Sequence, residues 1–276
     1  MRRRKLPLLI AVLVVSGPAW PQAEPAHGGK SVSGWVAQLK GAQGPGKLKA
    51  QADAVTALSA IGAPAVPALI GTLKDPSSDV RRSSCDALKA IGPPADSAIP
   101  ALIETLRDAS RMVRMRAAEA LGYVGPGAKA AVPSLAEALK DPDQWVRNYA
   151  AQSLGRIGPD AAPAVAGLVA ALQDQGIRHS AIQSLEKIGP AAAEPAVPAL
   201  IELVRSPGEP TGPEKSASGR YVPSQGAMTR VLAIKALGAM GPKAKAAIPV
   251  LNDARKDADP SVRYAAEDVL RKLQGK

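Results

Sequence analysis

The stretch Val66–Ile99 reads VPALIGTLKDPSSDVRRSSCDALKAIGPPADSAI, and the sequence then repeats it with small changes. Two series of residues recur 33 positions apart: Pro67, Pro100 and Pro133, and also Gly92, Gly125 and Gly158. A fixed period of roughly 20 to 50 residues is typical of proteins built from stacked repeats. In such proteins each unit buries its apolar face against its neighbours, so the sequence predicts a stack of similar units.

Each copy has the pattern of two helices joined by a turn. The first helix opens at Pro67, a position where the missing N–H leaves no intrahelical bond unmade. The second starts near Val80 and ends at Gly92–Pro93, because Gly supplies the left-handed residue that closes a helix and Pro cannot continue it. Aromatic residues make up only 3% of the chain and Phe is absent. We therefore expect thin helical layers packed through Ala, Leu, Val and Ile.

The copies at the two ends and the sixth copy depart from the pattern. The first copy begins irregularly at Trp35, and the seventh has Arg255 where the second has Leu73, as expected of end units with one face exposed. The sixth is interrupted by residues 206–226, which are rich in Pro, Gly and Ser. We predict a solenoid over residues 32–276 with a disordered insertion at about 206–226, preceded by a flexible tether at residues 24–31.

Residues 1–23 have the pattern of a secretory signal peptide. A basic start, MRRRK, precedes an apolar run at Leu6–Val15, and small residues follow it. The run is too short for an ordinary transmembrane helix, although an uncleaved membrane anchor remains the alternative. We expect cleavage near Ala19 or Ala23 and a mature chain without a membrane span. The predicted location is outside the cytoplasm, either secreted or in a bacterial periplasm.

The repeat pattern can be written P-x-L-x-x-x-L-x-D-x-x-x-x-V-R-x-x-A-x-x-A-L-x-x-I-G-P. It resembles HEAT repeats, especially the short variety found in phycobilisome lyases, and the resemblance covers Trp35–Leu273. It implies an all-α fold, a right-handed α-solenoid of about seven HEAT-like helical hairpins in which the second helix of each hairpin lines the concave side. Ankyrin repeats share the period of 33, but no copy contains their Thr-Pro-Leu-His motif.

Two series of charged residues recur in nearly every copy. The acidic series lies in the turn between the helices: Asp75, Asp108, Asp141, Asp174 and Asp257. The basic series lies at the start of the second helix: Arg81, Arg114, Arg147, Arg178, Arg230 and Arg263. Recurrence in copy after copy indicates a structural role rather than catalysis or phosphate binding. In HEAT-like stacks such Asp residues cap the next helix and bond the neighbouring Arg.

The sequence lacks the residue patterns of known enzyme classes. Its two histidines are His27 and His179, and it has neither the His-Glu pairs of HEAT-like di-iron hydroxylases nor a Gly-rich phosphate loop. Cys85 is the only cysteine and is expected to be a small buried side chain. We therefore predict no catalysis, no cofactor and no metal. The resemblance leaves an accessory subunit of a bilin-lyase-like enzyme as an alternative, against which the export signal argues.

Nucleic-acid binding is a second alternative, because the formal net charge is +11. Four of the positive charges lie at residues 2–5, within the predicted signal peptide. The variable positions of the second helices mix both signs, as Arg82, Asp86, Arg116 and Glu119 illustrate. A nucleic-acid surface would show a basic stripe with stacking aromatic residues, so this class is disfavoured.

Large side chains interrupt the Ala-rich background at non-core positions of consecutive copies: Met112, Met115, Tyr123, Trp145, Asn148 and Tyr149. Exposed Met and aromatic residues are typical anchors of protein interfaces. The alternative is that Trp145 and Tyr149 only cover the ends of repeats. Tyr221, isolated in the polar insertion, is a further candidate for a motif that orders on binding. Together these features predict an exported, non-catalytic scaffold that binds a protein partner.

Overall fold

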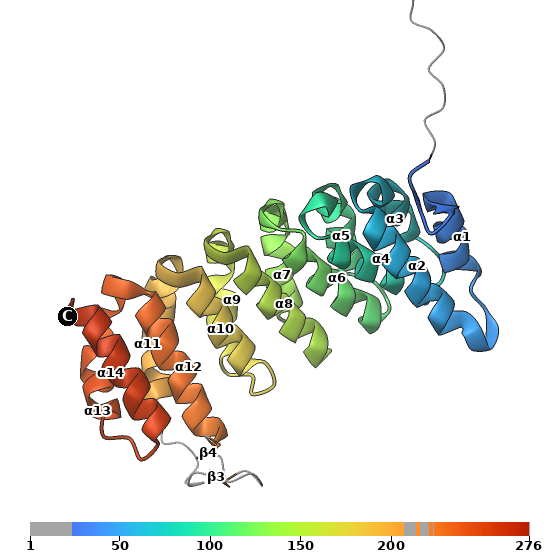
Figure 1. Ribbon diagram of the computed structural model, residues 1–276. Coiled ribbons are helices and arrows are strands. Elements are labelled where there is room, and N and C mark those ends of the chain that lie inside the picture. Colours follow the sequence, from blue (N-terminus) through green and yellow to red (C-terminus); the bar gives the residue numbers. More distant parts are fainter. Residues whose placement is uncertain (1–23, 207–213, 216–220, 223, 276) are drawn as a thin grey trace, which may run out of the picture.

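The computed structural model describes residues 24–206, 214–215, 221–222 and 224–275, which form a curved stack of seven helical hairpins (Figure 1). The first helices of the hairpins are α1 (Val32–Gly41), α3 (Val66–Thr72), α5 (Ile99–Thr105), α7 (Val132–Ala138), α9 (Val165–Ala171), α11 (Ala193–Arg205) and α13 (Ile248–Ala254). The second helices are α2 (Lys47–Ile61), α4 (Ser78–Ile91), α6 (Arg111–Tyr123), α8 (Gln144–Ile157), α10 (Arg178–Ile188), α12 (Gln225–Ala239) and α14 (Pro260–Gln274). The predicted all-α solenoid is confirmed.

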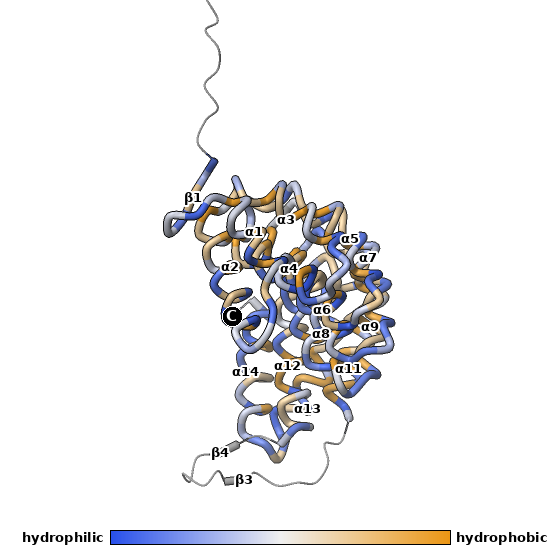
Figure 2. The backbone as a smooth tube through the Cα atoms, turned by 90° about the vertical axis from the view of Figure 1, so that its right-hand side faces the viewer, coloured by the Kyte–Doolittle hydropathy of each residue, from blue (hydrophilic) through white to orange (hydrophobic). Residues whose placement is uncertain are grey.

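The odd-numbered and even-numbered helices form two rows. Figure 2 places α3, α5, α7, α9 and α11 along the outside of the curve and the even-numbered helices along the inside. We call the even-numbered helices the inner row. Inner-row helices of neighbouring hairpins pack directly on one another, whereas neighbouring outer helices touch much less. This difference in packing curves the stack toward the inner row.

A short 3₁₀ segment joins each hairpin to the next, a feature that the sequence did not predict. They are η2 (Ala63–Ala65), η3 (Pro93–Ala98), η4 (Pro126–Ala131), η5 (Gly158–Ala164), η6 (Gly189–Ala192) and η7 (Gly241–Ala247), while η1 (Gly44–Gly46) lies within the first hairpin. Gly92 ends α4 with a φ of +72°, a conformation that favours glycine, and its N–H donates to the carbonyl of Leu88. The chain then continues into η3 because Pro suits the start of a helical turn.

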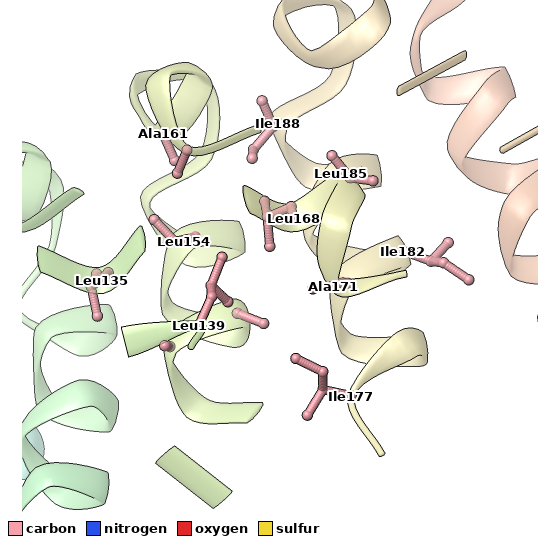
Figure 3. Close-up of a cluster of buried hydrophobic side chains, with 14 of the residues drawn as sticks. Leu135, Leu139, Leu154, Ala161, Leu168, Ala171, Ile177, Ile182, Leu185 and Ile188 are labelled. Carbon is pink, nitrogen blue, oxygen red and sulfur yellow. The ribbon is translucent and has the colours of Figure 1, made fainter. Parts of the chain in front are cut away.

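One continuous apolar core runs the length of the stack. The same leucine recurs on the inner row and is fully buried in α4, α6, α8 and α10: Leu88, Leu121, Leu154 and Leu185. Figure 3 shows part of this core, where Leu135 of α7 and Leu154 of α8 lie in one cluster with Leu168 of α9. Fully burying a leucine contributes about 1.5–3 kcal/mol, so these layers supply most of the cohesion between hairpins.

The inner-row helices approach so closely that only small residues fit between them. The Ser153 hydroxyl of α8 donates to the carbonyl of Ala118 in α6 over 2.7 Å. A Cβ atom added to Gly122 of α6 would lie 2.9 Å from the Cα of Ser153, closer than real Cβ atoms come. The next pair repeats the arrangement, with Gly155 facing Ser184. The Gly and Ser residues therefore set the spacing of the inner row.

The recurring charged residues join most hairpins to the next through side-chain contacts. Nε of Arg81 lies 2.6 Å from Oδ2 of Asp108, and Nη2 donates to Oδ1 over 2.9 Å. Nη1 of Arg81 donates to the carbonyls of Asp75 and Pro76 in its own turn. Arg114 makes the same two contacts with Asp141. Nε and Nη2 of Arg230 lie 2.9 Å and 3.1 Å from the Asp257 carboxylate, and Arg147 contacts Asp174 through Nε over 2.8 Å.

The aspartates differ from the prediction in one respect, because they do not cap the helices directly. Oδ1 of Asp108 accepts from the backbone N–H of Ser110, which is itself the N-cap residue of α6. Asp75 and Asp141 make the same bond to Ser77 and Asp143, the N-cap residues of α4 and α8. Each carboxylate thus shapes its own turn, and those of Asp108 and Asp141 also hold the arginine of the preceding hairpin.

We call the series of contacts between the aspartates and the basic residues of the preceding hairpins the ladder, and each of its contacts a rung. The two ends of the ladder and its fifth rung depart from the common arrangement. At the first junction Lys40 takes the place of an arginine, 3.5 Å from Asp75. Arg263 belongs to the last hairpin and bonds the carbonyls of its own turn. In the described part of the chain Arg178 has no aspartate partner, which corrects the prediction that it bonds one like the other arginines of the series. The position of the aspartate in the sixth hairpin, eight residues after Pro198, is occupied by Ser206.

Residues 24–31 are not the flexible tether that the sequence predicted. They contain an antiparallel pair, β1 (Ala26–His27) and β2 (Lys30–Ser31), joined through Gly28 and Gly29 with φ of +56° and +77°. The Glu24 carboxylate accepts from the N–H and hydroxyl of Ser33, and the Trp35 indole N–H donates to the carbonyl of His27. Two glycines that permit a tight turn and these bonds to α1 hold the segment against the first hairpin.

Two predicted segments fall largely outside the described residues: the signal peptide at residues 1–23 and the insertion at about 206–226. Within the insertion, β3 (Glu214–Lys215) pairs antiparallel with β4 (Tyr221–Val222). In the described part of the chain no single helix is long and apolar enough to cross a bilayer. Only the pair Gly44–Ile61 and Ala63–Thr72, bent by 120°, meets the length and composition of a span.

The close packing of the inner row can be tested by Gly122→Ala. The added Cβ meets the Ser153 backbone, so α6 and α8 must separate, and we expect the free energy of unfolding to fall by about 1–3 kcal/mol. Gly71→Ala in α3 is the matched control, since nothing lies within 4 Å of its added Cβ and Ala favours helix by up to about 1 kcal/mol. Urea denaturation measures both, and an equal effect of the two changes would contradict the close approach.

Candidate functional site

Three of the predicted partner-binding residues line one pocket between α6 and α8. Met112 and Trp145 are 41% and 59% exposed, and Met115 is 8% exposed at the base. Arg111 and Asp143 complete the lining of a pocket of about 270 Å³. All five residues lie in or just before the first turns of the two helices. Exposed apolar side chains around a hollow of this kind favour association with another molecule.

Asp143 fixes the start of α8 and therefore the position of Trp145. Its Oδ1 accepts from the backbone N–H groups of Trp145 and Val146, and its Oδ2 lies 3.2 Å from Nη1 of Arg111. Burial alone would raise the pKa of Asp143, but these N–H groups and the Arg111 guanidinium lower it below its usual value. The rim of the pocket thus carries an ionised aspartate paired with an exposed arginine.

The other predicted site residues do not join this pocket. Tyr123 lies at the far end of α6, where the Arg156 guanidinium stacks 4.0 Å from its ring centre. Asn148 is partly buried, and its Oδ1 accepts from the Ser180 hydroxyl over 2.6 Å. Tyr149 packs partly buried against the core. Tyr221 belongs to β4, and its side chain lies outside the described part of the structure.

The sequence reading missed several residues of this surface. Arg111 and Asp143 were not singled out, although Asp143 stands at the N-cap position held by Ser77 and Ser110 in earlier copies. Met228 is also exposed and lies two residues before Arg230, as Trp145 lies two before Arg147. The insertion hides this equivalence, because it disturbs the count from one copy to the next.

The charged residues of α4 and α6 neutralise one another on the inner surface. Arg116 lies 3.3 Å from Asp86 and 2.7 Å from Glu119, and Lys89 lies 3.3 Å from Glu119. Arg82 lies 3.5 Å from Asp86. A surface whose arginines are already paired with carboxylates is a poor binding site for a phosphate backbone.

Cys85 and His179 belong to residue types that often take part in catalysis. Cys85 is fully buried, and burial raises the pKa of its thiol, which suppresses the reactive thiolate. Nε2 of His179 lies 2.9 Å from the Thr229 hydroxyl, and burial together with the Arg178 charge lowers the pKa of His179. The described residues contain no cluster of three or more His, Cys, Asp or Glu side chains that could hold a metal ion.

Comparison with protein families settles the family of this chain. The model for HEAT repeats matches residues 39–122, 99–186 and 132–211, which together span more than half of the sequence. The chain is a HEAT-repeat protein. The resemblance seen in the repeat pattern is therefore confirmed, and the period of 33 belongs to the regular copies within the matched region. A search of the curated proteins finds no match.

Solved structures with the same fold include engineered repeat proteins. One engineered protein is 21% identical, with a TM-score of 0.61 over 88% of this chain and 68% of that one. A designed armadillo repeat protein in complex with the peptide (KR)4 is 19% identical, with a TM-score of 0.56 over 75% and 99%. The CpcE–CpcF complex of phycocyanin lyase from Nostoc sp. PCC7120 is 24% identical over 55% and 96%, with a TM-score of 0.49. At these identities the first two likenesses concern the fold alone, and the third supports no functional argument.

The exposure of Trp145 and the packing of Tyr149 predict different effects of removing them. Trp145→Ala should change the free energy of unfolding by less than about 0.5 kcal/mol, because the indole is mostly in solvent. Tyr149→Ala should lower it by about 1–3 kcal/mol, because the ring packs on the core. Urea denaturation of both variants measures the difference. An equal loss would mean that Trp145 serves to cover the repeat end.

Proposed function

We propose that this HEAT-repeat chain is an exported, non-catalytic scaffold that binds a protein partner on its inner row, with the α6–α8 pocket as the anchoring point. One observation carries the proposal: an exposed Trp145 stands beside a pocket lined by Met112 and Met115. Exposed tryptophan is costly in water and is enriched among the residues that dominate the binding energy of interfaces.

The size and chemistry of the pocket suit a single anchoring side chain. Its volume of about 270 Å³ lies below the roughly 300–1,000 Å³ of most small-molecule sites, so a cofactor is a poor fit. Methionine side chains are flexible and polarizable, and they can adapt to an apolar group of varied shape. The Arg111–Asp143 pair on the rim can orient the polar backbone beside that group.

The recurring charged residues support a scaffold rather than an enzyme, because their carboxylates and guanidinium groups bond one another between hairpins. The paired charges around Arg116 likewise disfavour nucleic acid as the partner. Export rests on the signal-peptide pattern of residues 1–23. No feature of the described residues favours the bilin-lyase alternative.

Site-specific photo-crosslinking in the native cells tests this function. A benzophenone amino acid placed at Trp145 should give an adduct with one discrete protein, because that side chain would lie in the interface. The same group at Leu48, which is 73% exposed on the first hairpin, is the matched control and should give none. If the chain is exported, the adduct will lack residues 1–19 or 1–23 by mass spectrometry.

Met112→Ala combined with the Trp145 probe makes the test specific. Removing the methionine side chain should reduce the yield of the adduct, since the pocket loses part of its apolar lining. No adduct at position 145, or the same adducts at 145 and 48, would contradict an anchor in this pocket.

A further inference from the structure

The junction between the fifth and sixth hairpins lacks the contact that joins the others. Ser206 stands where the second, third and fourth hairpins have an aspartate. Its hydroxyl donates to the carbonyl of Glu202 in its own helix over 3.0 Å. The arginine that should receive a carboxylate here is Arg178, at the first residue of α10.

The Arg178 side chain bonds the backbone of its own hairpin rather than a carboxylate of the next hairpin. Its Nε donates to the carbonyl of Leu172 over 2.6 Å. At Arg81 that nitrogen contacts the aspartate, and the carbonyl six residues before the arginine, that of Asp75, accepts from Nη1 instead. Among the described residues, nothing accepts a hydrogen bond from Nη1 or Nη2 of Arg178. Two guanidinium nitrogens on a partly exposed side chain are therefore available to an external acceptor.

Among the described residues, Arg230, the next arginine of the series, also lacks an acceptor for Nη1. α12 begins at Gln225, five residues before Arg230, whereas α4 begins three residues before Arg81. The extra residues use their carbonyls within the helix, since Ser224 accepts from the N–H of Met228 and Gln225 from the hydroxyl of Thr229. Nη1 of Arg230 is consequently buried without an acceptor.

The charge of Arg178 acts on His179, the next residue in the chain. Burial is the main cause that lowers the pKa of His179, and the positive charge of Arg178 lowers it further. The Nε2 contact between His179 and Thr229 spans α10 and α12, so this histidine reports directly on the junction.

We propose that Arg178 binds a carboxylate of the partner protein, which takes the place that an aspartate side chain occupies at the other junctions. The paired Arg–Asp contacts of this stack show that the position suits a planar carboxylate held by two N–H groups. An acidic partner also complements the positive net charge of the chain. α10 packs directly on α8, whose first turn carries Trp145, so one acidic and one apolar group of a partner could bind on adjacent helices.

The site can be tested without knowing the partner, by titrating the full chain into a fluorescein-labelled octaglutamate peptide at low salt. Arg178→Gln should weaken binding about tenfold, the effect of losing a charged hydrogen-bonded pair. Arg255→Gln removes the same charge from an exposed side chain on α13 and should change the affinity less than about twofold. Arg178→Lys, which keeps the charge but loses the paired N–H groups, should fall between them.

The pKa of His179, measured by proton NMR, distinguishes binding at Arg178 from nonspecific attraction of the peptide to the positive chain. Bound octaglutamate should raise the pKa of His179, because the carboxylate neutralises Arg178. In Arg178→Gln the pKa should already be higher and should not respond to the peptide. The proposed site would be wrong if Arg178→Gln and Arg255→Gln weakened peptide binding equally. It would also be wrong if the pKa of His179 did not change when the peptide binds. Neither result depends on Trp145, so failure here and failure of the α6–α8 anchor are distinguishable.

Discussion

The pairing of an arginine with the aspartate of the next turn is the interaction on which the regular stacking of this chain depends. Arg81 and Asp108 are only 16% and 10% exposed, so both charges are largely removed from water. Burial alone would raise the pKa of Asp108, but the hydrogen bonds from Arg81 and from the Ser110 N–H lower it. Because the folded pKa is lowered, the pair stabilises the fold at neutral pH. That contribution is lost as the pH falls from the ordinary aspartate value of about 4.

The arginine–aspartate pairs and the small residues of the inner row determine different features of the stack. Gly122 and Ser153 set how closely two helices approach, whereas the rung fixes which turn lies beside which. Each inner-row helix between the two end hairpins packs on its inner-row neighbours along two sides and on the outer row along another side. Only a narrow strip of its surface therefore faces solvent. Met112 and Trp145 lie on that strip, which is why the pocket forms between successive hairpins rather than within one.

Much of the fold follows from the sequence because a period of 33 constrains every copy at once. The hairpins, the leucine layers and the Gly–Pro ends could all be predicted from one repeat. The 3₁₀ segments could not, since Pro after Gly is equally compatible with a loop. The ordered hairpin at residues 24–31 depends on contacts with Ser33 and Trp35 that composition does not reveal.

The candidate sites were predictable to different degrees. The repeat pattern places Met112 and Trp145 at equivalent exposed positions, so their common pocket could be expected in outline. The role of Asp143 depends on the helix beginning two residues earlier than the sequence suggested. Arg178 follows Ile177 much as Arg81 follows Val80, although its turn is two residues shorter, and its missing partner is evident only from Ser206. The role of each arginine in the series therefore depends on the residue that faces it in the next hairpin.

A double-mutant cycle on Arg81→Gln and Asp108→Asn tests the importance of the rung most directly. Urea denaturation at pH 7 should give a coupling energy of about 1–3 kcal/mol, and the coupling should shrink when the pH is lowered below about 4. The exposed pair of Lys74 and Glu104, which also joins two hairpins, should give a coupling of no more than about 1 kcal/mol. A coupling at Arg81–Asp108 no larger than at the exposed pair, and unchanged by acid, would contradict a stack held in register by its arginine–aspartate rungs.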